Sequence, residues 1–167
     1  MSVSESQQLA LLNQNDKLLD ELYHHYASRW ALSDTAFWIL YVAWVQGDGC
    51  TQRDICASWS YTKQTINTAL KNLERQGYIR LIPLPDNRKS KQIRFTESGE
   101  QLADRIVTPL LRAEADSFAQ LSEQEQRELV RLSQKRTALL KKEMGRAIAS
   151  IQEGKTELPG RGQGELS

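Results

Sequence analysis

The sequence contains very little cysteine and histidine, with two of each among 167 residues. Cys50 and Cys56 are too few for a disulfide framework, and their spacing is neither that of a CxxC redox pair nor that of a zinc knuckle. His24 and His25 are adjacent, so on a helix they would point in different directions and could not share a metal ion. We therefore expect two reduced, partly buried thiols, no metal site and no other cofactor.

The chain also lacks a long hydrophobic run. Its longest one, AFWILYVAWV at residues 36–45, has about half of the roughly 20 residues that cross a bilayer, so it predicts a buried helix. The opening stretch MSVSESQQLALLNQ has no cationic segment ahead of an apolar one and is not a secretory signal. A hydrophobic share of 40% is enough for a compact core. We expect a soluble protein with a cytoplasmic location.

The residue combinations of common catalytic sites are missing as well. No nucleophile, base and orienting acid are spaced convincingly for catalysis, and no glycine-rich phosphate loop follows a predicted strand. An enzyme is therefore not expected.

The chain has almost no net charge, because its 22 Lys and Arg residues nearly balance its 21 Asp and Glu residues, which gives +1. Residues 51–96 nevertheless hold nine Lys and Arg against three acids, so this segment alone is +6. The rest of the chain, with 13 basic and 18 acidic residues, is −5. This uneven distribution of charge predicts that the basic segment forms one face that binds a polyanion. The acidic remainder of the chain would not bind that polyanion.

Periodic apolar residues predict helices at both ends of the chain and in between. From residue 11 to residue 30 they recur at intervals of three and four, which indicates a long amphipathic helix. Ser33 is suited to cap a second helix over Asp34–Gln46, which is apolar nearly all round and therefore central to the core. A further helix follows Thr96. The sequence Ser122-Glu-Gln-Glu125 is a capping box for a last long helix with an apolar stripe.

The middle of the chain predicts a helix-turn-helix followed by a hairpin. Thr51 opens a short helix over Gln52–Ser58, and Thr62 caps a second helix that ends at Gly77, where a left-handed residue belongs. After Gly77 the apolar period changes to two, with the turn-forming segment PDNRKSK at residues 85–91 between two alternating runs. The predicted fold is mainly α: a winged helix-turn-helix, with a three-helix core and a two-stranded β-hairpin wing, plus long N- and C-terminal dimerisation helices.

The predicted terminal helices extend beyond what one small winged helix can cover, so their apolar stripes need another partner. A second copy of the chain is the simplest partner, and a two-fold dimer would present two recognition helices to a pseudo-palindromic duplex. A monomer in which the first and last helices cover each other is the alternative. The expected organisation is an N-terminal dimerisation helix (1–32), a winged helix-turn-helix DNA-binding domain (33–99), C-terminal dimerisation helices (100–151) and a flexible tail (152–167).

The second helix of the helix-turn-helix has a polar face that predicts contact with nucleic acid. Residues 62–72 contain no acid, whereas a face that is merely solvated tends to pair Glu with Lys. Gln64 and Asn67 suit amide readout of base edges, while lysines and hydroxyls on this face suit phosphates. The predicted DNA-contacting residues are Thr62, Lys63, Gln64, Thr65, Asn67, Thr68 and Lys71, with Arg53 of the preceding helix as another phosphate contact.

In this order the elements resemble the MarR family of bacterial transcription regulators. The matching pieces are Thr62-Lys-Gln-Thr65, Leu73-Glu-Arg-Gln-Gly77-Tyr-Ile, and a wing with Asp86-x-Arg88 leading to Phe95-Thr96-Glu-x-Gly99. The resemblance implies a homodimer whose recognition helices enter successive major grooves while the wings reach the flanking minor grooves. It also implies that Arg88 enters the minor groove and that Asp86 orients its guanidinium, which leaves Lys89 and Lys91 as phosphate contacts at the wing tip.

The expected function is therefore sequence-specific regulation of transcription by a homodimer on double-stranded DNA, with repression the commoner outcome in the family. Family members often bind small aromatic or phenolic effectors, and Trp30, Trp38, Trp44 and Trp59 are candidates for such a pocket, although tryptophans on apolar helices more often belong to the core. Two alternatives stay open. One is a thiol-redox switch at either cysteine, and the other is a winged helix used only for protein–protein contact, whose binding would not fall steeply with salt.

Overall fold

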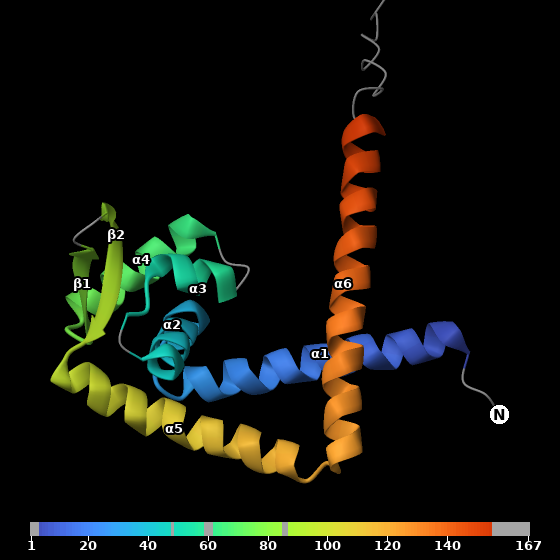
Figure 1. Cartoon of the computed structure of the whole chain (residues 1–167), viewed down its shortest axis with the longest axis horizontal. Helices are drawn as coiled ribbons and strands as arrows, with labels where there is room; N and C mark the ends of the chain where they lie inside the picture. The colour runs from blue at the N-terminus through green and yellow to red at the C-terminus, as the bar shows by residue number, and fades with distance from the viewer. Residues whose placement is uncertain (1–3, 48, 59–61, 85–86, 155–167) are drawn as a thin grey trace, which may run out of the picture. The chain divides into compact units, whose positions relative to one another are not determined.

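The computed structural model describes residues 4–47, 49–58, 62–84 and 87–154. These form six helices and a two-stranded antiparallel hairpin (Figure 1). The described residues up to Ala113 make one compact unit and those from Glu114 a second. The elements are α1 (Glu5–Ser28), α2 (Asp34–Gln46), α3 (Gln52–Ser58), α4 (Lys63–Arg75), β1 (Ile79–Leu84), β2 (Asn87–Phe95), α5 (Glu97–Ala119) and α6 (Glu123–Gly154).

The predicted N-caps are confirmed at three helices. At the start of α2, Ser33 accepts a hydrogen bond from the backbone N–H of Ala36, and at the start of α4, Thr62 accepts one from Thr65. Ser122 exchanges hydrogen bonds with the glutamate three residues further on, which is the predicted capping box of α6. A cap of this kind contributes about 1 kcal/mol, so these side chains decide where the helices begin.

Helix α3 begins after Thr51, as predicted, and an acid three residues further on completes its cap. The backbone N–H and the hydroxyl of Thr51 donate to the Asp54 carboxylate at 2.8 and 2.7 Å. The side-chain bond from Thr51, followed by the backbone bond, holds the pKa of Asp54 below its usual value. Because these bonds favour the charged carboxylate, the start of this seven-residue helix is fixed at neutral pH.

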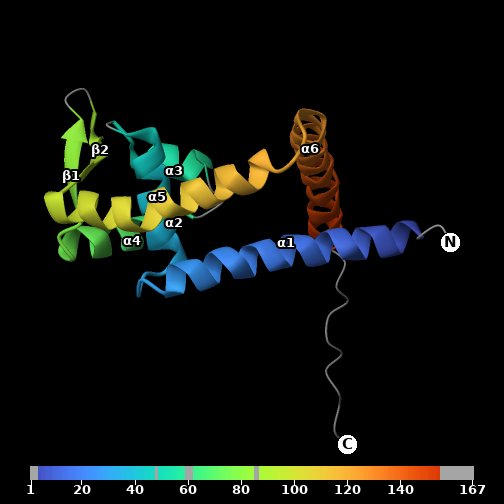
Figure 2. The same cartoon turned by 90° about the horizontal axis from the view of Figure 1, so that it is seen from below.

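The core lies in the first unit, around α2, which packs against α1, α3 and α4 (Figure 2). Phe37 and Leu40 of α2 are fully buried, as are Ile66 and Leu73 of α4 and Ile106 of α5. Each such side chain contributes roughly 1.5–3 kcal/mol when it is taken out of water. The nearly all-apolar composition of α2 thus follows from its being covered on several sides.

The hairpin confirms the predicted alternation of its strands. Ile79 of β1 pairs with Phe95 and Leu81 pairs with Ile93, and both Ile79 and Ile93 are buried on the side of the helices. The predicted turn at residues 85–91 is too long, because β2 already begins at Asn87. Pairing resumes there after a register shift between residues 83 and 84 of β1. Polar, turn-forming residues continue a strand here because a bulge absorbs the extra chain length.

Helix α5 is tied to α1 near its internal proline. Pro109 lacks the amide hydrogen that would bond to the Arg105 carbonyl one turn earlier. The hydroxyl of Tyr26 in α1 donates to the adjacent Ile106 carbonyl at 2.8 Å, and burial raises the pKa of this hydroxyl. Two helices distant in the sequence are thereby joined at the point where the backbone of α5 is weakest.

The outer helices keep large apolar side chains at the surface. In α1, Leu18, Leu19 and Leu22 are exposed. In α6 no described residue is buried, and its apolar stripe from Leu129 to Ile151 lies in solvent. The first residues of the predicted tail continue α6 to Gly154, and the remainder of that tail lies outside the described residues.

Within the described ranges, no helix is both long and apolar enough to cross a membrane.

Candidate nucleic-acid interface

Helix α4 separates its buried side from its exposed side as predicted. Ile66, Ala69, Leu70 and Leu73 are buried. The seven residues of this helix and its N-cap that are predicted to contact DNA are all exposed: Thr62, Lys63, Gln64, Thr65, Asn67, Thr68 and Lys71. The structure thus brings these residues together outside the buried side of one helix, and the acid-free polar surface is available to a partner.

Several polar groups on this surface are already engaged. The hydroxyls of Thr62 and Thr65 lie 2.7 Å apart, and the hydroxyl of Thr68 donates to the Gln64 carbonyl. These threonines are therefore oriented by the helix itself. The side chains of Gln64, Lys63 and Lys71 make no hydrogen bond or ion pair within the described part of the chain, so they are free to bind a ligand.

A cationic pocket lies next to the start of α4. It has a volume of about 400 Å³ between α3, α4 and β2. Arg53, Lys63 and Lys91 bring positive charge to it from these three elements, and none of the described residues that line it is an acid. The other described lining residues are Thr51, Gln52, Cys56 and Ser90. The arrangement suits an anion, because three like charges at one pocket attract one from solution.

The wing is hydrogen-bonded to α4 and to the segment just before α3. The backbone N–H of Leu81 in β1 donates to the Glu74 carboxylate of α4 at 3.0 Å. On the other edge of the hairpin, the N–H of Ile93 donates to the Cys50 carbonyl just before α3, at 2.7 Å. Sequence reasoning missed Glu74, because a carboxylate on a helix surface gives no sign that it binds a strand edge.

A close backbone approach fixes the base of the wing. The hydroxyl of Thr96 donates to the carbonyl of Gly77 and accepts from the N–H of Gly99. A Cβ at Gly99 would lie 1.8 Å from the Tyr78 carbonyl oxygen, so only glycine fits there. Gly77, with φ of 80°, adopts the left-handed conformation predicted for it. The Phe95-Thr96-Glu-x-Gly99 motif is therefore a structural joint.

The outer wing is only partly described. Asp86 lies outside the described residues, and Arg88 and Lys89 belong to β2 by their backbone alone. Lys91, further along β2, lines the cationic pocket together with Arg53. Lys91 therefore places a positive charge of the wing beside the helix-turn-helix.

A sequence model of the MarR family matches residues 32–90, which span α2 to the first part of β2. Over these residues the chain matches the MarR family. This match supports a DNA-binding transcriptional regulator rather than an enzyme.

The individual relatives agree with this assignment. The chain is 28% identical over 116 residues to the HTH-type transcriptional regulator PecS of Dickeya dadantii (strain 3937), which is 68% of each protein. It resembles the S. aureus MepR–DNA complex with a TM-score of 0.63 at 23% identity, covering 83% of this chain and 99% of that one. It also resembles the structure of Bordetella bronchiseptica BpsR, whose DNA binding is regulated by 6-hydroxynicotinic acid. The TM-score is 0.62 at 17% sequence identity, and the match covers 82% of this chain and 98% of that one. These structures confirm the MarR-like winged helix-turn-helix fold.

The two cysteines have different environments. Cys50 is 3% exposed, and burial, together with the charge of Asp54, raises the pKa of its thiol to about 11. Cys56 is half-buried and lines the cationic pocket. At neutral pH, Cys50 is protonated and inaccessible, which are poor properties for a thiol sensor. Their spacing in the sequence did not distinguish them.

The tryptophans proposed for an effector pocket lie in different contacts of the MarR fold. The ring centroid of Trp38 is 5.0 Å from that of Tyr23, which joins α2 to α1. Trp44 meets Phe95 of the hairpin edge-on at 5.8 Å. Trp59 lies outside the described residues. Trp38 and Trp44 therefore join secondary-structure elements.

Trp30 has a polar atom that the fold does not use. Its indole Nε1 is buried and has no hydrogen-bond partner among the residues that the structure describes. The guanidinium of Arg105 in α5 lies 5.3 Å from the centre of the indole ring. A buried N–H without an acceptor is uncommon in proteins, so Trp30 and Arg105 are the described residues most suited to an aromatic anion.

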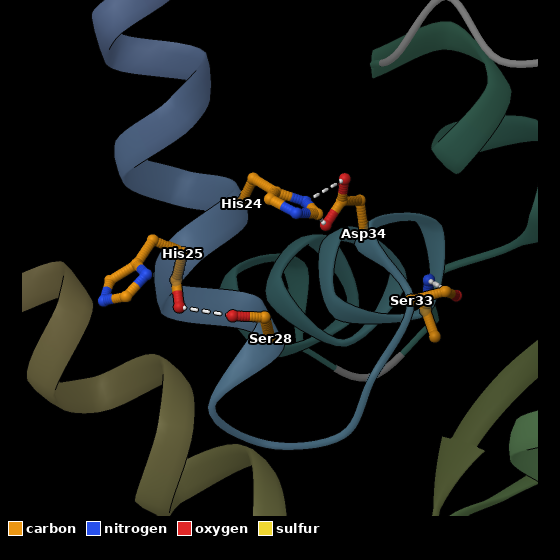
Figure 3. A network of polar contacts seen from close by, with 6 residues as sticks. His24, His25, Ser28, Ser33 and Asp34 are labelled. Carbon is orange, nitrogen blue, oxygen red and sulfur yellow. Dashed lines mark hydrogen bonds and ion pairs between the residues drawn. The ribbon is translucent and has the colours of Figure 1, made fainter.

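The adjacent histidines point in different directions, as predicted (Figure 3). Nδ1 of His24 lies 2.9 Å from the Asp34 carboxylate at the start of α2, while Nε2 of His25 lies 3.1 Å from the Arg29 guanidinium. Both side chains are thus used in contacts near the junction of α1 and α2.

Proposed function

We propose that the protein represses transcription by binding a pseudo-palindromic operator in double-stranded DNA as a homodimer, and that a small aromatic effector releases it. The observation that carries this proposal is the exposed, acid-free surface of α4 next to a pocket lined by three cations. A solvated helix face without a partner rarely has that combination.

In this proposal α4 enters the major groove. Gln64 and Asn67 read base edges, because their amides can match the donors and acceptors displayed there. Lys63, Lys71 and Thr62 contact phosphates. The hydroxyls of Thr65 and Thr68 contact phosphates as well. Such contacts set the register of the helix on the duplex without adding sequence information.

The cationic pocket is proposed to receive one backbone phosphate. Arg53, Lys63 and Lys91 approach it from α3, α4 and β2, so one phosphate would bridge the helix-turn-helix and the wing. Neutralising a phosphate releases condensed counterions and makes the affinity fall steeply with salt. Removing one of these cations, as in Lys63→Ala, should weaken binding to all sequences alike. It should also reduce the slope of the logarithm of the binding constant against the logarithm of the salt concentration by about 1.

The wing is proposed to reach the flanking minor groove. Arg88 enters the groove, Asp86 orients its guanidinium and Lys89 contacts a phosphate, since a planar cation suits the enhanced negative potential of a narrow groove. The bonds from Glu74 and Cys50 to the hairpin support this role, because they hold the wing at a set position beside α4.

The outer helices are proposed to form the dimer. Their exposed apolar residues supply a surface that a second copy would bury: Leu11, Leu12, Leu18, Leu19 and Leu22 in α1, and Leu129, Leu132, Leu139, Leu140, Met144, Ile148 and Ile151 in α6. A two-fold dimer places two α4 helices about one helical turn of DNA apart, roughly 34 Å. An effector acts by changing that separation.

The effector is proposed to be a small aromatic acid that uses Trp30, with Trp38, Trp44 and Trp59 as further candidates. The unpaired indole N–H of Trp30 and the neighbouring guanidinium of Arg105 support this choice. In a titration with hydroxylated aromatic acids, tryptophan fluorescence should change at the concentration that releases DNA. Trp30→Phe removes the N–H and should weaken the response, whereas equal responses of both proteins would exclude Trp30.

The DNA-binding proposal is tested most directly at the wing. Arg88→Ala should weaken operator binding by roughly 1–3 kcal/mol, the range of a good arginine contact to DNA, while folding is unchanged. Arg127→Ala is the matched control, because Arg127 is an exposed residue of α6 whose ion pair with Glu123 is local. Gel-shift titrations in which the two variants bind alike would contradict the wing assignment. Affinity that does not fall with salt would contradict DNA binding altogether.

A further inference from the structure

One hydrogen-bonded pair links the two helices of the helix-turn-helix at the proposed reading surface. Nε2 of Gln52, the first residue of α3, donates to Oδ1 of Asn67 in α4 at 2.7 Å. The same nitrogen lies 3.5 Å from the backbone carbonyl of Lys63. Gln52 is half-buried and lines the cationic pocket, while Asn67 is exposed.

The carbonyl of Lys63 determines which way both amides point. A backbone carbonyl can only accept a hydrogen bond, so the end of the Gln52 amide that faces α4 is the NH2 group. The atom of Asn67 that receives the short bond must then be its oxygen. Asn67 therefore keeps its NH2 group, with two donors, for a partner outside the protein.

We infer that Gln52 is a specificity-determining positioning residue, which makes Asn67 read bases as a hydrogen-bond donor. A free asparagine favours adenine, because it can donate to N7 and accept from the N6 amino group at once. The Asn67 oxygen is already bonded to Gln52, so the adenine pairing is weakened. Guanine, with N7 and O6, and thymine, with O4, offer acceptors to the remaining NH2 group.

This inference rests on the proposed contact between α4 and base edges, and it adds a residue that does not itself touch the base. Gln52 lies on α3, outside the predicted reading set, and acts through Asn67. A merely structural Gln52 would affect folding stability and leave base preference unchanged. Base preference at one position is therefore the decisive measurement.

The test begins by locating the base pair that Asn67 reads. Sequences bound by the full-length protein are selected from a random pool, and the same selection with Asn67→Ala identifies the position at which preference is lost. At that position the wild-type protein should favour guanine or thymine. Replacing the selected guanine with 7-deazaguanine, which lacks the N7 acceptor, should lower affinity.

Two substitutions of Gln52 then change the orientation of Asn67. Gln52→Ala frees the Asn67 oxygen, so the preference should move toward adenine by about tenfold, the scale of one bidentate contact. Gln52→Glu presents only acceptors, so it should turn the Asn67 NH2 group toward α3 and its oxygen toward the groove. Bases with an amino donor, cytosine and adenine, should then be favoured.

A charge control is needed, because Gln52→Glu adds a negative charge beside Arg53, Lys63 and Lys91. Ala57→Glu places the same charge on an exposed position of the same helix. It should lower affinity for all sequences alike and leave the base preference intact. Circular dichroism of each variant checks that the fold is retained.

The outcomes separate the inference from the function on which it rests. If Gln52→Ala and the wild type prefer the same base at the Asn67 position, the positioning role is overturned. If Asn67→Ala changes the preference at no position while DNA is still bound, base reading by Asn67 is wrong and the inference fails with it. If the wild-type protein binds no DNA, the proposed function itself is wrong.

Discussion

Helices α4 and α6 have apolar stripes of the same kind and differ in what covers them. In α4, Ile66 and Leu73 are completely buried against the rest of the first unit. In α6, Leu139 and Met144 are 52% and 55% exposed, and no described residue of the helix is buried. The covered stripe belongs to the core of the first unit, whereas the uncovered one is available to the proposed dimer partner.

The polar contacts of the two regions differ in the same way. In the first unit, bonds such as Leu81 to Glu74 and Tyr26 to Ile106 join different elements. In α6, ion pairs such as that of Arg127 with Glu123 join residues three or four positions apart, and the Gln126 side chain bonds to the carbonyls of Phe118 and Leu121 just before the helix. Local pairs of this kind contribute about 0.3–0.5 kcal/mol each to the helix. They support helix formation without fixing what the helix packs against.

The largest effect is expected where the exposed stripe of α6 is given a charge. Leu140→Asp should raise the dissociation constant of the proposed dimer by at least about 100-fold, because a two-fold interface would bury the carboxylate twice. Ala138→Asp introduces the same group between the lysines of the polar face and should leave the dimer intact. Sedimentation equilibrium measures both, and an unchanged Leu140→Asp dimer would remove α6 from the interface.

The same glycine-to-alanine change should alter the free energy of unfolding in opposite directions in the two regions. Gly99→Ala should lower the free energy of unfolding by about 3 kcal/mol, since its Cβ would meet the Tyr78 carbonyl and force the backbone apart. Gly145→Ala in α6 should raise it by about 0.5–1 kcal/mol, because nothing lies near the added methyl group and alanine favours the helix. Urea unfolding followed by circular dichroism distinguishes them, and equal signs would contradict this difference.

A smaller effect is expected from the bond that holds the wing to α4. Glu74→Ala leaves the exposed edge amide of Leu81 to water and should cost about 1 kcal/mol. Glu74→Gln keeps an oxygen acceptor and should cost less. Hydrogen exchange at the Leu81 amide is the specific measurement. Protection that survives Glu74→Ala would show that the hairpin is held by other contacts.

The smallest effect concerns pH, and it compares one capping pair from each unit. Hydrogen bonds from Thr51 and from Ser122 lower the pKa values of Asp54 and Glu125. A carboxyl whose pKa is lower in the folded state stabilises the fold above its unfolded pKa, and this contribution is lost as the pH falls through the folded value. Stability should therefore decline below about pH 4.

Removing either capping hydroxyl should make that decline shallower. Thr51→Val acts on the first unit and Ser122→Ala on the second, so unfolding followed at several pH values separates the two contributions. A pH profile that neither substitution alters would mean that other carboxyl groups cause the decline.

Much of the fold could be predicted from local sequence. Ser33, Thr62 and Ser122 determined helix starts through their own side chains, and Gly77 determined the end of α4 through its backbone. Such signals involve residues only a few positions apart. They can therefore be recognised in the sequence before the packing of the helices is known.

The rest depended on contacts between elements. The bulge that lets β2 begin at Asn87 arises from strand pairing, so composition alone placed a turn there. The difference between Cys50 and Cys56 follows from which one the core covers. The bond from Gln52 to Asn67 requires knowing how α3 crosses α4, which no period in the sequence reveals.

The two bonds that hold the hairpin, at Leu81 and at Ile93, have a consequence for regulation. They join the wing to α4 and to the residue that precedes the start of α3 by two positions, so in the proposed complex the major-groove and minor-groove readers would move together. Under that proposal an effector would release both readers of a half-site at once. Moving the two half-sites apart in the DNA should then reproduce the effect of the proposed ligand.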